Sequence, residues 1–298
     1  MIIPTPDIDQ LRQQISGLIT LSYVATGGFK VVFRGVYDSG RVEAIKAIYI
    51  PSEADGFAPE QSAQLVARAQ REIVVLRSCQ PLCIVKLGSV EPRPITIGAH
   101  TYLVYSEEFL PGQPMSGLIN QQQPPDFGML KSVFSFLIDV IREMVRLEYL
   151  HRDIKPGNIM VTGLPDRPYV ILDLGIAYKV QGTELTQGMT PPGTRSYMAP
   201  ELFMPNYKDV MDFRCDLYSA GLTVYVLASG IHPFAPKPED EVATVVRVVT
   251  QRPPPLETLR PDLPVVFCRI IDRCIKKNLA LRYARIDLLH QELQEVQK

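Results

Sequence analysis

Strand patterns and helix patterns occupy different parts of this chain. Short runs of β-branched and aromatic residues predict strands at 17–24, 30–37, 42–50, 83–90 and 101–109. Apolar residues at helical spacing predict one helix among these strands, at 59–78, with Pro59 at its first position. Beyond residue 112 the predicted elements are helices, at 127–150, 209–230, 239–250 and 264–296. We expect a chain in this order to fold as an α+β protein with two regions that join near Glu108–Gly112.

The composition excludes several classes of protein. Hydrophobic residues make up 46% of the 298 residues, enough for one large domain or two lobes. A formal net charge of −1 does not favour a nucleic-acid-binding protein. The five cysteines follow no zinc-binding or C-x-x-C spacing, which fits a reducing compartment. The N-terminus lacks a signal-peptide pattern and the apolar run AGLTVYVLASGI is too short to span a bilayer, so we expect a cytoplasmic protein without a membrane partner.

The segment LHRDIKPGNIMV, residues 150–161, carries the strongest indication of chemistry. Asp153 and Asn158 lie five residues apart in a loop after a predicted helix, and Lys155 lies between them. At this spacing a carboxylate can orient a hydroxyl nucleophile while an amide binds a metal ion. Asp173 ends an apolar, strand-like run and is a second candidate ligand, because Mg²⁺ takes few protein oxygens together with phosphate oxygens. The alternative is that these residues are ordinary charges of surface loops.

These residues are part of a longer series. HRDIKPGN is followed by DLG at 173–175 and APE at 199–201, and this series resembles the signature motifs of the eukaryotic-type protein kinases. Further motifs follow the family order: AIK at 44–46, DLYSAG at 216–221 and CIKKNLALR at 274–282. The resemblance covers about residues 18–292, and its style is closest to bacterial serine/threonine kinases.

The resemblance implies a two-lobed, protein-kinase-like fold. Residues 1–17 would form an N-terminal extension, and residues 18–109 a small lobe with an antiparallel β-sheet and one helix. Residues 110–298 would form a larger, mainly helical lobe, with ATP bound between the two lobes near the hinge.

The resemblance also assigns catalytic roles. Asp153 would orient the substrate hydroxyl and accept its proton, and Lys46, positioned by Glu72, would bind the α- and β-phosphates of ATP. Asn158 and Asp173 would hold Mg²⁺, or Mn²⁺ in its place. Lys155 and Thr194 match the serine/threonine-specific branch. Three more residues would be structural: Asp216 would brace the backbone of the catalytic loop, and Glu201 would pair with Arg282.

The glycine loop of the family, G-x-G-x-x-G-x-V, is degenerate in this chain. Val32 aligns with the valine, which puts Ala25, Gly27 and Lys30 at the three glycine positions. Gly27 and its neighbour Gly28 still allow backbone N–H groups to approach phosphates. A plain β-hairpin is the alternative for this stretch. The sequence favours Lys30 as a solvated charge of a strand over a role on the phosphates.

The rest of the nucleotide pocket is also assigned by resemblance. Val32, Ala44 and Met160 match the positions that sandwich the adenine, although an ordinary core role is equally compatible with their chemistry. Glu108 and Leu110 belong to the hinge segment EEFLPG, which would hold the nucleotide. One register places Glu107 at the gatekeeper position, and a one-residue insertion would place Tyr105 there instead.

The sequence predicts an active serine/threonine protein kinase with an activation loop that it phosphorylates itself. Thr183, Thr186 and Thr190 are the candidate acceptors, with Thr186 and Thr190 favoured. Two alternatives are a pseudokinase scaffold, favoured by the lost glycines, and a small-molecule kinase of the aminoglycoside-phosphotransferase type. Lys155 and the expected Glu201–Arg282 pair argue against the second alternative. The protein substrate and the oligomeric state do not follow from the sequence.

Overall fold

The computed structural model describes residues 3–119, 123–174, 178–179, 194–236 and 241–297. The chain divides into two compact units. The first comprises Met1–Ser78 and Val85–Leu110, and the second comprises Cys79–Ile84 and Pro111–Lys298. The short segment Cys79–Ile84 therefore packs with the second unit, a feature that the sequence does not indicate.

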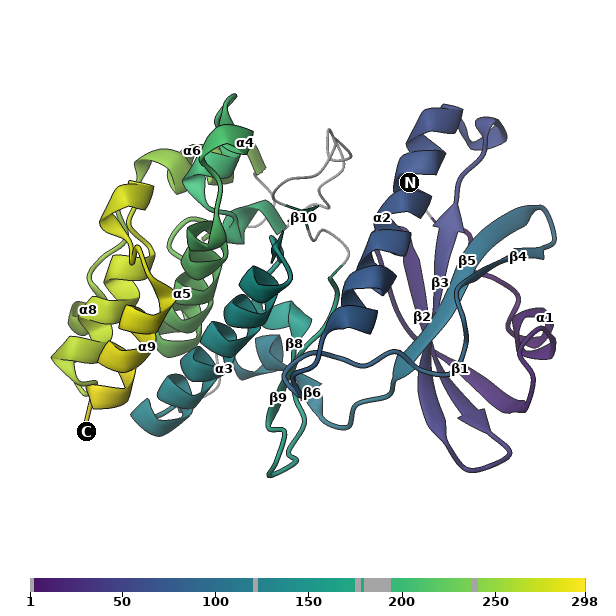
Figure 1. Cartoon of the computed structure of the whole chain (residues 1–298), viewed down its shortest axis with the longest axis horizontal. Helices are drawn as coiled ribbons and strands as arrows, with labels where there is room; N and C mark the ends of the chain where they lie inside the picture. The colour runs from purple at the N-terminus through teal and green to yellow at the C-terminus, as the bar shows by residue number, and fades with distance from the viewer. Residues whose placement is uncertain (1–2, 120–122, 175–177, 180–193, 237–240, 298) are drawn as a thin grey trace. The chain divides into compact units, whose positions relative to one another are not determined.

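A five-stranded antiparallel sheet forms the first unit (Figure 1). Its strand order is β1-β2-β3-β5-β4, with antiparallel pairing throughout. The strands are β1 (Leu18–Gly27), β2 (Lys30–Tyr37), β3 (Val42–Ile50), β4 (Arg93–Ile97) and β5 (His100–Glu108). Helix α2 (Pro59–Ser78) begins at Pro59 as predicted, because a proline at the first helical position costs no backbone hydrogen bond.

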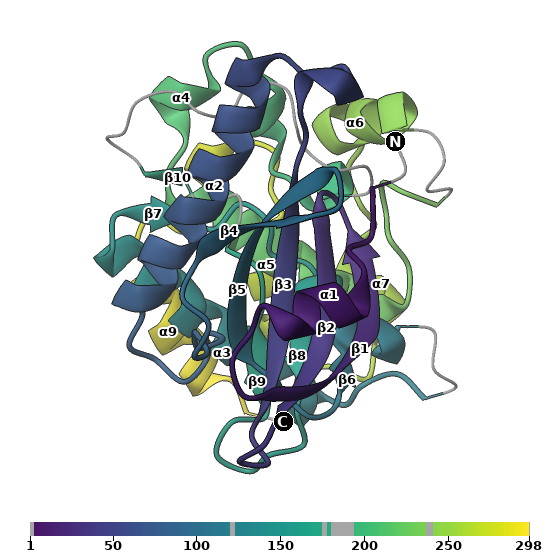
Figure 2. The same ribbon diagram turned by 90° about the vertical axis from the view of Figure 1, so that its right-hand side faces the viewer.

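The two faces of this sheet have different coverings. One face carries Val31, Phe33, Ile45 and Val104 in a core with Leu11 of α1 (Ile8–Gln13), and Figure 2 shows α1 lying across this face. The other face packs against α2 through a smaller cluster: Ile48, Ala69, Ile73, Leu103 and Tyr105. The N-terminal residues before β1 are thus part of the core of the first unit.

The fourth strand was predicted in the wrong place. Residues 83–90 form no named strand, and β4 lies at Arg93–Ile97 instead. The backbone N–H groups of the earlier segment bond partly to side chains: Ser89 N donates to Glu43 at 3.0 Å and Val90 N donates to Ser106 Oγ at 2.9 Å. Strand β4 holds Pro94, which is tolerated because β4 is at the edge of the sheet.

Helices dominate the second unit (Figure 1). They are α3 (Phe127–Arg146), α4 (Tyr207–Val210), α5 (Phe213–Ser229), α6 (Glu241–Thr250), α7 (Leu256–Leu259), α8 (Val265–Cys274) and α9 (Ile286–Glu295). Helix α5 is buried along nearly its whole length and packs against α3 and α8. Asp212 caps its first turn by accepting from Arg214 N at 2.9 Å, and Gly230 ends it with a φ of 70°.

Three predicted helix ranges are not single continuous helices. The range 209–230 breaks at Met211–Asp212, between α4 and α5. Helix α3 ends at Arg146 rather than at residue 150, because Glu148 has a φ of 61° and Tyr149–Leu150 forms strand β7. The range 264–296 is interrupted between α8 and α9 by an irregular segment that contains Arg282.

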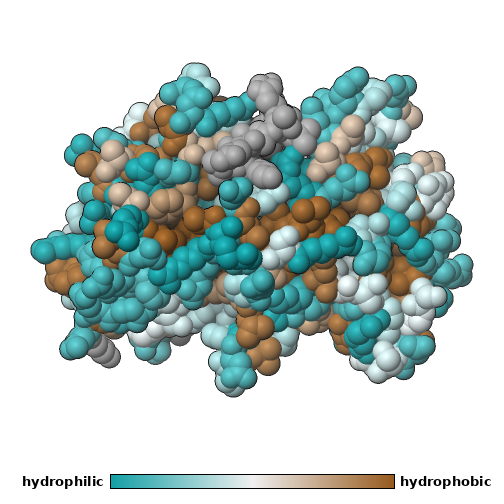
Figure 3. All heavy atoms as spheres, in the orientation of Figure 1, coloured by the Kyte–Doolittle hydropathy of each residue, from teal (hydrophilic) through white to brown (hydrophobic). Residues whose placement is uncertain are grey.

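The second unit also contains two small sheets of short strands. Strands β6 (Gln113–Pro114), β8 (Ile159–Val161) and β9 (Tyr169–Ile171) form one small sheet, and β7 pairs with β10 (Tyr178–Lys179). Figure 3 shows hydrophilic and hydrophobic side chains mixed over the visible surface. Among the described residues, no helix combines the length and the hydropathy needed to cross a bilayer.

Candidate active site

The loop that precedes Asp153 is fixed by a buried carboxylate of helix α5. Asp216 accepts hydrogen bonds from two consecutive backbone N–H groups, those of His151 at 2.7 Å and Arg152 at 2.8 Å. Burial raises the pKa of Asp216 to about 6, and the two N–H donors act against this rise. Arg152 has a φ of 63°, so the chain turns sharply just before Asp153. The bracing role predicted for Asp216 is what the structure shows.

The Asp153 carboxylate is held from two sides. Lys155 Nζ donates to both of its oxygens, at 2.8 and 2.9 Å. Asn158 Nδ2 donates to the backbone oxygen of Asp153 at 2.9 Å and to its Oδ2 at 2.8 Å. Pro156–Asn158 forms a single turn of 3-10 helix, which brings residues five apart in sequence together. Burial raises the pKa of Asp153, and the neighbouring Lys155 ammonium opposes that rise.

Asp173 is tied to the same loop through the backbone. It follows strand β9 with a φ of 59°, and the N–H of Leu172 donates to the carbonyl of Asn158 at 2.7 Å. The charge of Asp173 contributes to raising the pKa of Asp153, so the two carboxylates repel each other across this site. Asp153, Lys155, Asn158 and Asp173 are thus brought together in the second unit, as predicted.

His151, next to this site, is neutral at physiological pH. Burial lowers its pKa to about 4, although the Asp173 charge acts in the opposite direction. Its Nδ1 accepts from the backbone N–H of Asp153 at 3.2 Å. This arrangement fits a structural residue of the loop.

A second group of predicted residues lies in the first unit, on the face of the sheet under α2. Across the sheet, Ala25 pairs with Val32, Val32 with Lys46, and Lys46 with Tyr105. Directly opposite residues project to the same face of an antiparallel sheet, so these side chains form one row. Ala44 lies on the same face two residues before Lys46, and Glu72 reaches the row from α2.

Lys46 has two acidic neighbours instead of the single one expected. Its Nζ lies 3.7 Å from Glu72 Oε1, which is the predicted pair, and donates a short hydrogen bond to Glu107 Oε1. The pairing of β3 with β5 runs without a shift and places Glu107 opposite Ala44 and Tyr105 opposite Lys46. Burial raises the pKa of Glu107, and the charge of Lys46 lowers it.

Lys30 does not have the solvated environment that its sequence position suggested. It begins β2, and its Nζ lies 3.4 Å from Glu72 Oε1. Its side chain is only 15% exposed. The isolated sequence pattern could not reveal this contact, because it depends on how β2 packs beneath α2.

The glycine stretch is a tight hairpin. Gly27 pairs with Lys30, which leaves Gly28 and Phe29 as the two turn residues. Gly28 has a φ of 58°, as the first central residue of a type II′ turn requires. A side chain at Gly27 would meet nothing within 4 Å, so backbone access at this position is open. Phe29 packs edge-on against Phe57, with ring centroids 5.8 Å apart.

The remaining predicted nucleotide residues are divided between the two units. Glu108 ends β5, and its Oε1 accepts from the backbone N–H of Lys86 at 2.7 Å, while Leu110 is the last residue of the first unit. Met160 lies in β8 of the second unit, paired with Val170 of β9. Thr194 begins a 3-10 turn, but its side chain is outside the described residues, as are Thr183, Thr186 and Thr190.

The predicted long-range ion pair is present in the second unit. Arg282 Nη1 and Nη2 donate to the two oxygens of Glu201 at 2.6 and 2.8 Å. Arg282 also bonds the backbone oxygens of Lys276 and Arg214 and lies over the ring of Tyr218. These contacts connect the segment after Thr194 to the C-terminal helices.

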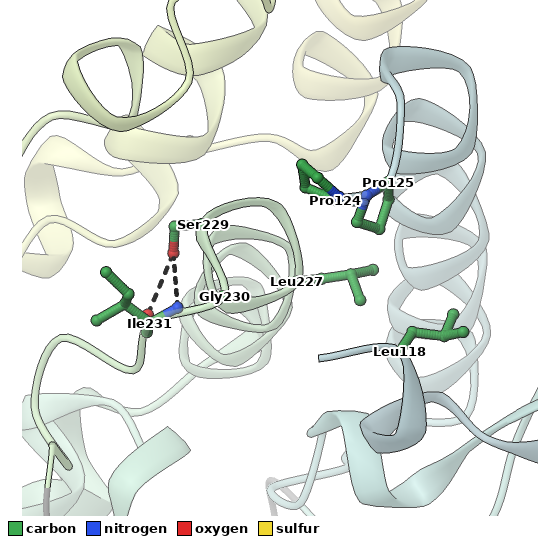
Figure 4. Close-up of a pocket in the computed structure, with 7 residues that line it drawn as sticks. All are labelled: Leu118, Pro124, Pro125, Leu227, Ser229, Gly230 and Ile231. Atoms are coloured by element: carbon green, nitrogen blue, oxygen red, sulfur yellow. Dashed lines mark hydrogen bonds between the residues drawn. The ribbon is translucent and has the colours of Figure 1, made fainter. Parts of the chain in front are cut away.

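The second unit also has a hollow whose described lining residues lie outside the Asp153 loop and carry no charge. Figure 4 shows it between the end of α5 and the segment before α3, with Leu118, Leu227 and two prolines around it. Its hydroxyl, that of Ser229, is already bonded to Ile231 and to the oxygen of Tyr225. The residues around this hollow offer no acid, base or charge for catalysis.

Known proteins share this arrangement of motifs. The family model of the protein kinase domain matches residues 19–293. The chain is 28% identical to serine/threonine-protein kinase pkn3 of Myxococcus xanthus, over 99% of this chain and 53% of that protein. It is 30% identical to serine/threonine-protein kinase PknA of Mycobacterium tuberculosis, over 87% of this chain and 56% of that protein. The chain spans about half the length of these relatives. With the kinase-domain match covering nearly all of its length, the chain belongs to the protein kinase family.

Proposed function

We propose that this chain is an ATP-dependent protein kinase that transfers the γ-phosphate of ATP to serine or threonine hydroxyls of proteins. The observation that carries the proposal is the Asp153 carboxylate, held by Lys155 and Asn158 on a loop that Asp216 fixes. The relatives named as serine/threonine-protein kinases support the choice of substrate class.

In this proposal Asp153 orients the substrate hydroxyl and takes its proton as the oxygen bonds to the γ-phosphorus and ADP leaves. Lys155, 2.8 Å from Asp153, keeps the carboxylate ionised and offers a positive charge to the transferring phosphoryl group. Thr194 is proposed to complete this group through its hydroxyl.

Asn158 and Asp173 are the residues that would hold Mg²⁺, or Mn²⁺ in its place. The donors fit a hard divalent cation, because an amide and a carboxylate lie next to a second carboxylate whose pKa Asp173 raises by repulsion. The ion would supply neutralisation of charge on the phosphate oxygens. The residues proposed for ATP itself are Lys46 with Glu72 for the phosphates, Ala25, Gly27 and Gly28 at the hairpin, and Val32, Ala44, Glu108, Leu110 and Met160 around the base.

We further propose autophosphorylation at Thr186 or Thr190 and a cytoplasmic location. All five cysteines are free, which supports a reducing compartment. Mass spectrometry of wild type and Asp153→Asn expressed in parallel tests the first point. Equal phosphorylation in the two proteins would contradict autophosphorylation.

The proposed function is tested by incubating the protein with γ-labelled ATP and Mg²⁺. The acceptors are the protein itself, a generic protein substrate and an aminoglycoside, and the labelled amino acid is then identified. We expect label on serine or threonine, lost in Asp153→Asn and in Lys46→Met. Label on the aminoglycoside alone would identify a small-molecule kinase. ATP binding without any transfer would identify a pseudokinase scaffold.

A further inference from the structure

Four charged side chains from four elements of the first unit meet beneath α2. They are Lys30 of β2, Lys46 of β3, Glu72 of α2 and Glu107 of β5. Lys46 contacts both carboxylates, and Lys30 contacts the same Glu72 oxygen as Lys46 does. We call these four side chains the charge cluster.

The charge cluster is almost completely removed from solvent. The side chains of Glu72, Glu107 and Lys46 are 1%, 2% and 8% exposed. An unpaired charge in such a place is strongly unfavourable, whereas a paired and hydrogen-bonded one is tolerated. Two ammonium and two carboxylate groups make the cluster neutral. Without Lys30, one ammonium would face two buried carboxylates.

The electrostatics of Glu107 show the same interdependence. Burial and the Glu72 charge disfavour the ionised form of Glu107, while Lys46 and Lys30 both favour it. Lys30 therefore stabilises the Glu107 carboxylate through its charge, in addition to its direct partner Glu72.

We propose that Glu107 is a second positioning carboxylate for Lys46, and that Lys30 supplies the positive charge that offsets this second buried carboxylate. This inference rests on the proposed function, in which Lys46 binds the phosphates of ATP. An ammonium has three donors. Glu107 accepts a hydrogen bond from one of them, and the Glu72 carboxylate, 3.7 Å away, attracts the ammonium from a second direction. Lys30, which pairs with the same Glu72 oxygen, offsets part of that attraction and so keeps Lys46 on Glu107.

Lys30 and Glu107 then act as one functional pair, so changing both should be less harmful than the two separate effects combined. Lys30→Met leaves an excess negative charge in the cluster, and Glu107→Leu leaves an excess positive one. The double variant Lys30→Met/Glu107→Leu retains one lysine and one glutamate, Lys46 and Glu72, and is neutral again.

The test is a double-mutant cycle with two readouts, urea unfolding and kcat/KM for ATP. We expect each single variant to lower kcat/KM roughly tenfold. Independent effects would lower kcat/KM of the double variant about a hundredfold, but we expect a loss of only about tenfold. In urea unfolding we expect the same coupling, about tenfold in the unfolding equilibrium constant. The matched control cycle is Arg77→Met with Glu91→Leu, an exposed ion pair of the same unit, for which we expect no coupling in kcat/KM.

The coupling measured between Lys30 and Glu107 decides whether the two residues act as a pair. Effects of Lys30→Met and Glu107→Leu that simply multiply would overturn it. If Lys30→Met fails to fold alone, recovery of folding by the added Glu107→Leu supports the pairing, and failure of the double variant beside a folded Glu107→Leu overturns it. The unfolding cycle needs no catalysis, so a wild type that transfers no phosphate would refute the proposed function and leave the charge pairing separately measurable.

Discussion

The buried ion pair of Glu201 and Arg282 gives the sharpest prediction for stability. The Arg282 side chain is 0% exposed and that of Glu201 is 9% exposed. The two terminal guanidinium nitrogens donate to the carboxylate, at 2.6 and 2.8 Å. Arg282→Met keeps an unbranched apolar stem but removes the charge, the hydrogen-bond donors and the volume of the guanidinium group. Its main consequence is an ionised Glu201 left in a buried place, with Cys215 Sγ as a weak donor at 3.2 Å.

Removal of one partner from such a pair costs about 3–5 kcal/mol. For a domain of the size of the second unit, this corresponds to a fall in melting temperature of roughly 6–20 °C. Adding Glu201→Gln removes the stranded charge, so the double variant should recover a large part of the loss. Burying neutral groups is less costly than burying one uncompensated charge.

The assay is urea unfolding of wild type, Arg282→Met, Glu201→Gln and the double variant, followed by fluorescence and circular dichroism. The matched control is Arg142→Met, which breaks a surface pair with Asp287 whose side chains are 35% and 67% exposed. We expect the control to cost less than about 1 kcal/mol. A loss in Arg282→Met no larger than in Arg142→Met would show that the buried ion pair does not stabilise the second unit.

Three further predictions follow from the second unit. Gly112→Ala should be strongly destabilising in thermal unfolding, because its Cβ would lie 1.9 Å from the oxygen of Val161. The control Gly163→Ala, also at positive φ but in open space, should cost far less, and equal losses would show that the clash at Gly112 is not the cause. Asp216→Asn should cost about 1–3 kcal/mol in urea unfolding and most of the phosphotransfer activity, because the amide NH2 replaces one of the two accepting oxygens and faces a backbone N–H donor. An unchanged kcat would count against the bracing role. Burial lowers the pKa of His232 to about 4, so its stabilising contribution is complete above pH 6.5 and is lost as the pH falls through 4. In His232→Asn the unfolding free energy should therefore fall less between pH 6.5 and pH 4, by up to about 3 kcal/mol. An unchanged slope would exclude this histidine as the cause of the fall.

The parts of the site that were predictable from sequence are of two kinds. Asp153, Lys155 and Asn158 lie within six residues, so a single turn of backbone brings them together and the spacing alone indicates a shared site. Glu201 and Arg282 are 81 residues apart, and only the order of the family motifs connected them.

Contacts that depend on sheet register and helix packing could not be predicted. Glu107 reaches Lys46 because β5 pairs with β3 in one particular register, which no local pattern specifies. Lys30 is buried because α2 lies over the start of β2. Residues 83–90 have the apolar character of a strand, yet their N–H groups bond partly to the side chains of Glu43 and Ser106, so the edge strand forms further along the chain.

In the proposed function, Asp153 is the catalytic carboxylate of an active protein kinase. The most direct test compares kcat for phosphate transfer and Kd for ATP in wild type and in Asp153→Asn, measured on the same preparations. We expect kcat to fall about 10²–10⁴-fold with ATP affinity nearly unchanged, because Asp153 acts on the hydroxyl proton and not on the nucleotide. An Asp153→Asn protein that transfers phosphate as fast as wild type would contradict the claim.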